Sequence, residues 1–278
     1  MELVCYAVSG GRIMSTEQRG IGSVEVGGQL LRVLTEAEGP MMLRDLAASA
    51  DMTAAKAHPY LVSYMRLGLI EQDRASGRYE LGPLALQMGL ASMRRLTPVR
   101  VATEAIAELV LRINQTVALS VWGNHGPTVV RIEEGTGAVH VNMRVGSIMS
   151  LLGTATGRVF AAFLPPKMIE TFIESGVGRA SVGDEAERRM TRNQIDKAVA
   201  EVREKGLARA VEKPIPGVNA FSAPVFDHSG SIALVITAIG PSHTFVADWN
   251  GPIAEELRKC AAIVSMRLGF SSKGSKAA

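Results

Sequence analysis

Residues 43–81 have the sequence LRDLAASADMTAAKAHPYLVSYMRLGLIEQDRASGRYEL, and this stretch decides the fold of the first part of the chain. Leu46 and Ala47 fall on the apolar side of a short helix, and the small side chain of Ala47 would let a second helix cross closely. Asp51 follows where a turn is needed, because Asp tolerates a left-handed backbone better than most residues. Thr53 is typical of a residue that caps the next helix, since its hydroxyl can accept a hydrogen bond from a backbone N–H group.

The helix that Thr53 begins has a predicted inner face and a predicted end. The inner face is expected from side chains near helical spacing: Tyr60, Leu61, Tyr64 and Leu67. Gly68 should end the helix, because glycine readily adopts the left-handed backbone of a C-cap. Residues 69–72 and 78–81 then predict two short strands joined by a turn at 73–77. This order of helix, turn, helix and hairpin is typical of a winged helix-turn-helix, which places its second helix in the major groove of DNA.

The exposed start of the second helix and the hairpin supply candidate contacts to double-stranded DNA. Lys56 can reach a phosphate or a guanine edge, and His58 is a second polar candidate on the same turn. Arg74 and Arg78 lie on the hairpin, where a wing would meet the adjacent backbone or minor groove, although single charges on turns are more often simply solvated. The predicted DNA-binding residues are Thr53, Ala54, Ala55, Lys56, His58, Arg74 and Arg78.

Composition limits the class of protein. Hydrophobic residues make up 47% of the 278 residues, which is enough for a buried core, and no apolar run reaches the roughly 18 residues that a membrane-spanning helix needs. We therefore expect no membrane partner. Cys5 and Cys260 give neither a disulfide framework nor a metal-ligand spacing, which fits a reducing cytoplasm. Residues 1–96 hold ten Lys and Arg against ten Asp and Glu, so a strong non-specific DNA binder is not expected, whereas a local basic face is still compatible.

The remaining chain predicts further helices and then a mixed domain. An apolar helix over about 24–37 ends before Gly39-Pro40, and Pro83 and Pro98 each begin another helix. After residue 114 strands are mixed with helices, which indicates an α+β sheet domain. Strands are expected at 117–122, 128–133, 139–143, 148–152, 207–211, 221–226 and 232–239. Helices are expected at 153–164, 167–175, 191–205 and 249–268.

One segment of this second part is suited to an anion. Residues 153–157, Gly-Thr-Ala-Thr-Gly, open a helix directly after a predicted strand, where free backbone N–H groups and the helix dipole attract negative charge. Close packing of helix on sheet is an equally good reason for Gly157. Thr237 is the one polar residue in the strand ALVITAI, and a buried hydroxyl needs a partner, which is either a ligand or a strand neighbour.

Enzyme chemistry finds little support in the sequence. Asp227-His228-Ser229 contains the residue types of a catalytic triad, but three consecutive side chains diverge and cannot form one. The five His residues show no metal-binding spacing such as HExxH. We therefore expect no catalytic residue, no metal site and no cofactor.

The whole pattern resembles the IclR family of bacterial transcription regulators. The resemblance rests on the apolar helix before Gly39-Pro40 and on the segments LRDLA, LVSYMRLGLIEQD and GRYELGPLALQMG, and it covers about residues 24–270. It implies a two-domain chain: an N-terminal winged helix-turn-helix, a helical linker and a C-terminal α+β, GAF-like effector-binding domain. The expected boundaries are a disordered leader at 1–20, the winged helix-turn-helix at 21–82, the linker at 83–97, the effector-binding domain at 98–270 and a disordered tail at 271–278.

The resemblance also implies partners and a ligand site. It predicts binding to a palindromic operator, assembly into a homodimer or homotetramer through residues that include the linker, and control by a small organic acid. An apolar pocket with a few convergent polar groups suits such an effector. The expected effector-binding residues are Gly153, Thr154, Ala155, Glu212, Asn219, Ala220, Ser222 and Thr237.

Pro59 departs from the family pattern, in which an Arg usually stands at this position. Proline inside a helix removes one backbone hydrogen bond and crowds the preceding turn. Either the recognition helix is kinked at Pro59, or regular helix begins near it, since proline suits the first turn of a helix. The alternative for the whole chain is a metabolite-binding sensor or enzyme whose winged helix serves protein contacts only, and the neutral charge of residues 1–96 is its best support.

Overall fold

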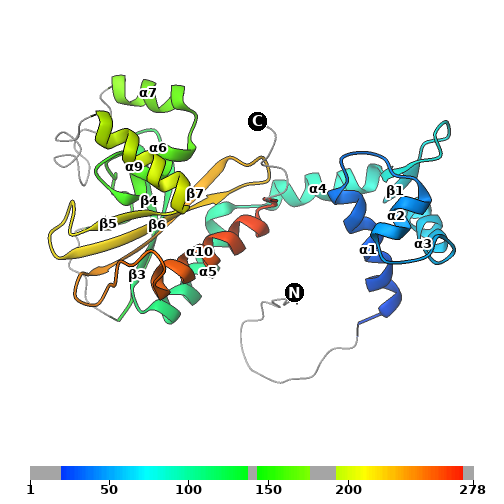
Figure 1. Ribbon diagram of the computed structural model, residues 1–278, viewed down its shortest axis with the longest axis horizontal. Coiled ribbons are helices and arrows are strands. Elements are labelled where there is room, and N and C mark those ends of the chain that lie inside the picture. Colours follow the sequence, from blue (N-terminus) through cyan, green and yellow to red (C-terminus); the bar gives the residue numbers. More distant parts are fainter. Residues whose placement is uncertain (1–19, 137–142, 176–191, 272–278) are drawn as a thin grey trace. The chain divides into compact units, whose positions relative to one another are not determined.

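The structure is a computed structural model that describes residues 20–136, 143–175 and 192–271. The predicted leader, the predicted tail after residue 271, the strand expected at 139–143 (Met143 excepted) and the helix cap at Thr191 lie outside these ranges. The contacts between residues divide the chain into two compact units, and the boundary in the sequence falls between Arg95 and Leu96 (Figure 1). Each unit has its own hydrophobic core.

The first unit contains four helices and a small hairpin (Figure 1). Its elements are α1 (Gly22–Glu36), α2 (Leu43–Ser49), α3 (Ala54–Leu67), β1 (Ile70–Gln72), β2 (Tyr79–Leu81) and α4 (Pro83–Arg95). Leu30, Leu46 and Leu61, one from each of α1, α2 and α3, are fully buried together with Ile70 of the hairpin. The hairpin strands are antiparallel, and Met41 adds an isolated bridge to Tyr79. A helix-turn-helix with a short wing is therefore present.

The turn and cap signals between α2 and β1 behave as predicted. Asp51 has a left-handed backbone with φ of 53°, Thr53 is the N-cap of α3, and Gly68 is its left-handed C-cap with φ of 75°. The prediction for Leu67 was wrong, because this side chain is 60% exposed. Six residues separate Leu67 from the buried Leu61, which at about 100° per residue places Leu67 well off the inner face.

Pro59 lies inside a helix that runs without a break from Ala54 to Leu67. The alternative in which regular helix begins near Pro59 was therefore wrong. Because Pro59 has no N–H group, the carbonyl of Ala55 loses its usual partner within the helix. The helix is stabilised on both sides of Pro59, because Thr53 caps its start and Leu61 is buried in the core after the proline.

The second unit is a five-stranded antiparallel sheet between two layers of helices (Figure 1). The strand order is β4-β3-β7-β6-β5. The strands are β3 (Thr116–Gly123), β4 (Gly126–Glu133), β5 (Ala208–Val211), β6 (Val218–Phe226) and β7 (Ile232–Pro241). The described helices are α5 (Pro98–Ile113), α6 (Ala155–Phe163), α7 (Pro166–Ser175), α9 (Arg192–Lys205) and α10 (Pro252–Arg267).

Successive side chains along each strand point to opposite faces of the sheet, so the unit has two hydrophobic cores, one on each face. In β7, Leu234, Ile236 and Ala238 pack with α5 and α10, whereas Val235 and Ile239 pack with α6 and α9 on the other face. Figure 1 shows α6, α7 and α9 together on one side of the sheet and α5 with α10 on the other. Thr237, between Val235 and Ile239, therefore faces α6.

Three predicted elements differ from the structure by three residues or more at one end or are absent as strands. Residues 148–152 do not form a strand: Ile148 makes an isolated bridge to Thr128 of β4, the Met149 N–H donates to the Pro127 carbonyl, and the chain then turns at residues 151–153 into α6. Strand β6 begins at Val218, three residues before the predicted start, and α10 begins at Pro252. Trp249, expected inside that last helix, stacks instead under the guanidinium of Arg209, 4.5 Å from its ring centre.

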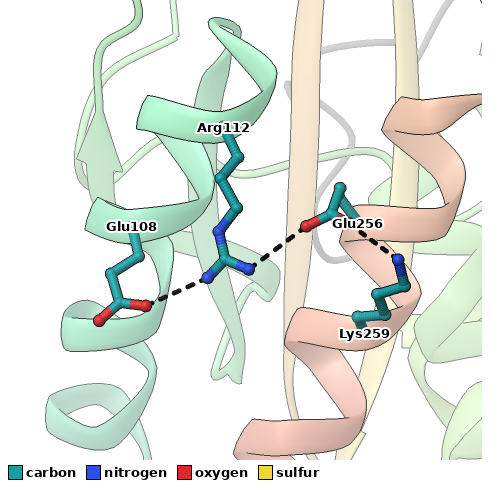
Figure 2. Close-up of polar contacts among 4 residues, drawn as sticks. All are labelled: Glu108, Arg112, Glu256 and Lys259. Atoms are coloured by element: carbon teal, nitrogen blue, oxygen red, sulfur yellow. Dashed lines mark hydrogen bonds and ion pairs between the residues drawn. The ribbon is translucent and has the colours of Figure 1, made fainter. Parts of the chain in front are cut away.

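A polar network crosses from α5 to α10 (Figure 2). Arg112 of α5 pairs with Glu108 at 3.1 Å on its own helix and with Glu256 of α10 at 3.3 Å. Lys259 pairs with Glu256 at 2.9 Å. The Arg112 side chain is half exposed, so each pair contributes at most about 1 kcal/mol. The buried apolar side chains beneath, such as Leu109 and Leu257, hold the two helices together.

Candidate functional site

The start of α3 presents the predicted DNA-binding residues to solvent. The Thr53 hydroxyl accepts a hydrogen bond from the Lys56 N–H at 3.3 Å, so this side chain is engaged as a cap. Ala54, Ala55, Lys56 and His58 are all exposed, whereas Ala57 is fully buried and fixes the orientation of the helix. Lys56 carries a fixed positive charge that can approach a phosphate.

The wing holds its two arginines differently. The Asp73 carboxylate accepts hydrogen bonds from the Ser76 hydroxyl and from the N–H groups of Ala75 and Ser76. These hydrogen bonds lower the pKa of Asp73, the one from the Ser76 hydroxyl most and the two from backbone N–H groups less. They also fix the shape of the turn. Arg74 is exposed on this turn, whereas Arg78 donates to the carbonyl of Pro40 at 3.1 Å. Arg74 is therefore the more available wing cation, and Arg78 ties the hairpin to the loop before α2.

A small apolar cavity lies at the start of α6, above β6 and β7. Its volume is about 40 Å³, close to the space of one water molecule, so a larger ligand must widen it. Of the predicted effector residues, Thr154, Ala155, Ala220 and Thr237 line the cavity, and Gly153, Glu212, Asn219 and Ser222 do not. The described residues that line it are Met143, Met149, Thr154, Ala155, Thr156, Ala210, Lys213, Pro214, Ile215, Val218, Ala220, Thr237 and Ile239.

The first turn of α6 uses some of its polar groups internally and leaves others available. The Thr154 hydroxyl donates to the Ser150 carbonyl at 2.8 Å and accepts from the Gly157 N–H at 3.0 Å. The N–H groups of Ala155 and Thr156 have no protein acceptor among the described residues, as expected for the first residues of a helix. Two backbone donors at the positive end of α6 are therefore available beside the cavity.

A chain of three buried hydroxyl groups crosses the cavity wall. The Thr237 hydroxyl oxygen lies 2.9 Å from that of Thr156 and 2.8 Å from that of Ser222. Three hydroxyl groups carry three protons, and the two hydrogen bonds use two of them. At Ser222, which is fully buried, a third proton would have no acceptor among the described residues. At Thr156 or Thr237 the proton would face the cavity, where a ligand oxygen can accept it.

Asn219 and Glu212 shape the loop next to the cavity. The Asn219 side chain accepts from the Glu212 N–H at 3.1 Å and donates to the Phe245 carbonyl at 2.9 Å. Glu212 has a left-handed backbone with φ of 49°, which directs the following Lys213 and Pro214 to the cavity. Both predicted residues therefore position the loop, and neither contacts the cavity.

Sequence reasoning missed two polar residues of the cavity. Thr156 is the fourth residue of the glycine-rich segment, and its inward direction depends on where α6 begins. Lys213 lies in a loop without regular periodicity and is exposed at the rim. Glu212 stands directly before it and Arg209 four residues before it, so the local sequence does not mark Lys213 as part of a ligand site.

A larger, open groove of about 670 Å³ lies between Trp122 at the end of β3 and Phe172 of α7. Among the described residues, Lys167 is the one charged residue that lines it, and the groove reaches Ser175, the last residue described before the gap at 176–191. The described polar side chains along it are those of Asn124, Lys167, Thr171 and Ser175. The smaller cavity, with donors from α6, β7 and the 213–215 loop, is the better candidate for a ligand.

Other site types find no support in the described residues. No group of three His, Cys, Asp or Glu side chains there could hold a metal ion, and none of the described helices is long and apolar enough to cross a membrane. In the tight turn between β6 and β7 the Ser229 hydroxyl donates to the Asp227 carboxylate, so the expectation that these two side chains diverge was wrong, and the bond stabilises the turn.

Two family models match the chain, one over each unit. The family model described as "Bacterial transcriptional regulator IclR C-terminal" matches residues 91–266, and that described as "IclR helix-turn-helix domain" matches residues 23–74. The chain belongs to the IclR family. Members of this family are non-enzymatic, DNA-binding transcription regulators, so the two-domain fold and the absence of an enzyme activity are confirmed.

Individual relatives match nearly the whole chain. The crystal structure of HmgR from Pseudomonas aeruginosa is 36% identical, with a TM-score of 0.81 over 91% of this chain and 100% of that one. The glycerol operon regulatory protein of Streptomyces griseus is 30% identical over 90% of this chain and 98% of its own length. The regulator KipR of Bacillus subtilis is 25% identical over 83% and 91%. The IclR fold therefore extends over both units of this chain.

Proposed function

We propose that this IclR-family regulator binds a small organic acid in the cavity at the start of α6, and that the ligand changes its affinity for an operator. The observation that carries the proposal is the kind of polar group around the cavity. The Ala155 and Thr156 N–H groups, the spare hydroxyl proton and the Lys213 ammonium are all donors. A ligand that satisfies them must present acceptor oxygens and negative charge, as a carboxylate does.

The remaining lining residues determine the chemistry of the part of the ligand that is not the carboxylate. Met149, Pro214, Ile215, Val218 and Ile239 offer apolar surface and no acceptor from their side chains. A carboxylate with a compact apolar body therefore fits better than a sugar or a polyamine, which would leave donors of their own unpaired. Because the cavity of about 40 Å³ is smaller than such a ligand, binding must displace the Lys213–Ile215 loop or the Met143 and Met149 side chains.

A two-fold dimer of the regulator would bind an operator whose two half-sites form a palindrome. Helix α4 has no buried residue in the described chain, and Leu86, Leu90 and Met93 form an exposed stripe at i, i+4 and i+7. Such a stripe on a helix is stabilised by a second apolar surface. We assign that surface to α4 of a second copy, because a two-fold dimer presents two α3 helices to two half-sites.

One set of titrations tests the proposal. The full-length protein is titrated onto labelled DNA from upstream of its own gene, with salt varied, in the presence of benzoate, phenylacetate, pyruvate or the matched amides. We expect salt-dependent DNA binding that at least one carboxylate shifts and its amide does not. If none of the carboxylates changes the affinity for DNA, the effector proposal is contradicted. If the protein does not bind this DNA at all, the proposed operator binding is contradicted.

A further inference from the structure

The outward face of α3 is apolar at its leading end. Ala57 and Leu61 are both fully buried and mark the inner face. Ala55 and Pro59 are exposed, lie one helical turn apart and point away from that inner face. The two side chains that face solvent most directly in the first turns of the helix therefore carry no hydrogen-bonding group.

The polar side chains near Ala55 and Pro59 either lie beside this apolar stripe or already make hydrogen bonds within the helix. The Thr53 hydroxyl caps the helix, and the Ser63 hydroxyl donates to the Pro59 carbonyl at 3.0 Å. Lys56 and His58 are exposed, but each lies about 60° to 100° around the helix from Pro59 and flanks the apolar stripe. Lys56 suits phosphate contact, which positions a helix in the groove without reading sequence.

The major groove of DNA presents one apolar group, the C5-methyl of thymine. We propose that Ala55 and Pro59 form a thymine-reading surface, so that each operator half-site places thymine methyl groups against this stripe. The inference rests on the proposed binding of an operator by α3. It gives Pro59 a function: the proline ring weakens the helix from within, and in return it presents an apolar edge where a longer polar side chain would hold the helix away from the methyl groups.

Substitution of thymine by uracil tests the contact directly, because uracil lacks only the C5-methyl. A duplex is first selected from a random pool by the full-length protein, and each thymine is then replaced by uracil in turn. We expect about a three- to fivefold loss of affinity at one or two positions of each half-site and almost none elsewhere, the size expected for one buried methyl group.

The variant Pro59→Ala separates a reading role from a mere defect in the helix. We expect it to raise the thermal stability of the first unit and to reduce the thymine-to-uracil ratio at one position to near 1. Pro83→Ala, at the first residue of α4, is the control and should leave every ratio unchanged. If no duplex is selected, operator binding itself fails. If a selected duplex tolerates uracil at every position, or if Pro59→Ala keeps the full ratios, the thymine-reading role is overturned while operator binding stands.

Discussion

The hydroxyl oxygens of Thr156 and Thr237 lie 2.9 Å apart and join the first turn of α6 to the central strand β7. Both side chains are almost fully buried, and both line the cavity that we assign to the effector. A ligand that accepts the spare proton of this pair touches a helix and the sheet at once. Binding can therefore be coupled to the position of α6, which is the requirement for a ligand that prefers one state of the protein.

Thr156→Val should weaken the effector response. Valine keeps the shape of the side chain and removes the hydroxyl, while Thr237 keeps its bond to Ser222 at 2.8 Å. We expect a stability loss of about 1 kcal/mol and at least a roughly tenfold weaker binding of the active carboxylate, measured by calorimetry. DNA binding without effector should not change. Thr103→Val removes a hydroxyl that bonds to Val99 on α5, away from the cavity, and should leave carboxylate affinity as it is.

Gly157→Ala should destabilise the second unit. A Cβ atom on Gly157 would overlap the backbone carbonyls of Ser150 and Leu151, which cannot move without shifting the turn that leads into α6. We expect a loss of about 3 kcal/mol, seen as a lower midpoint in thermal unfolding followed by circular dichroism. The matched change Gly89→Ala on α4 meets no atom within 4 Å and should stabilise its helix by about 1 kcal/mol. An unchanged midpoint for Gly157→Ala would mean that the segment before α6 is loosely packed.

Local chemistry explains which features could be predicted from the sequence. Asp51, Thr53 and Gly68 each act through their own backbone or the next turn, so their roles are visible in a few consecutive residues. Leu67 was misplaced because a helix face is defined by phase, and a small error in phase accumulates towards the helix end.

Long-range pairing explains what could not be predicted. Thr156 and Thr237 are 81 residues apart, so neither shows its partner in the local sequence. Arg78, which is predicted to contact DNA, also donates to the Pro40 carbonyl, and this bond spans 38 residues, so the local sequence does not show it. Residues 148–152 satisfy a strand pattern, but only their first residues bond to the edge strand β4 before the chain turns into α6, and the local sequence does not show where that turn begins.

Leu86→Glu should break the proposed contact between two α4 helices. Leu86 is 65% exposed in the single chain, so a charge costs little there, but it would be buried in a dimer that uses the Leu86–Leu90–Met93 stripe. We expect the mass measured by light scattering to fall to that of one chain, with at least tenfold weaker operator binding. Leu111→Glu on α5, at a position 84% exposed, is the control for a surface charge. A variant that keeps the mass of the wild type would place the dimer interface elsewhere.

Cys260 should resist modification in the folded protein and make the second unit sensitive to alkali. Burial raises the pKa of this thiol to about 12, with smaller contributions from the charges of Arg112, Glu108 and Glu256 nearby. The unfolded thiol ionises near its ordinary value of 9.0, so above that pH the unfolded state releases a proton that the folded state keeps. The stability of the wild type relative to Cys260→Ala should therefore be constant below about pH 9 and fall by up to ~1.4 kcal/mol per pH unit above it. Denaturant titrations of both proteins at several pH values measure the difference, and iodoacetamide at pH 8 should label the Cys260 peptide only after unfolding. Rapid labelling of that peptide in the native protein would show that α10 opens readily from α5.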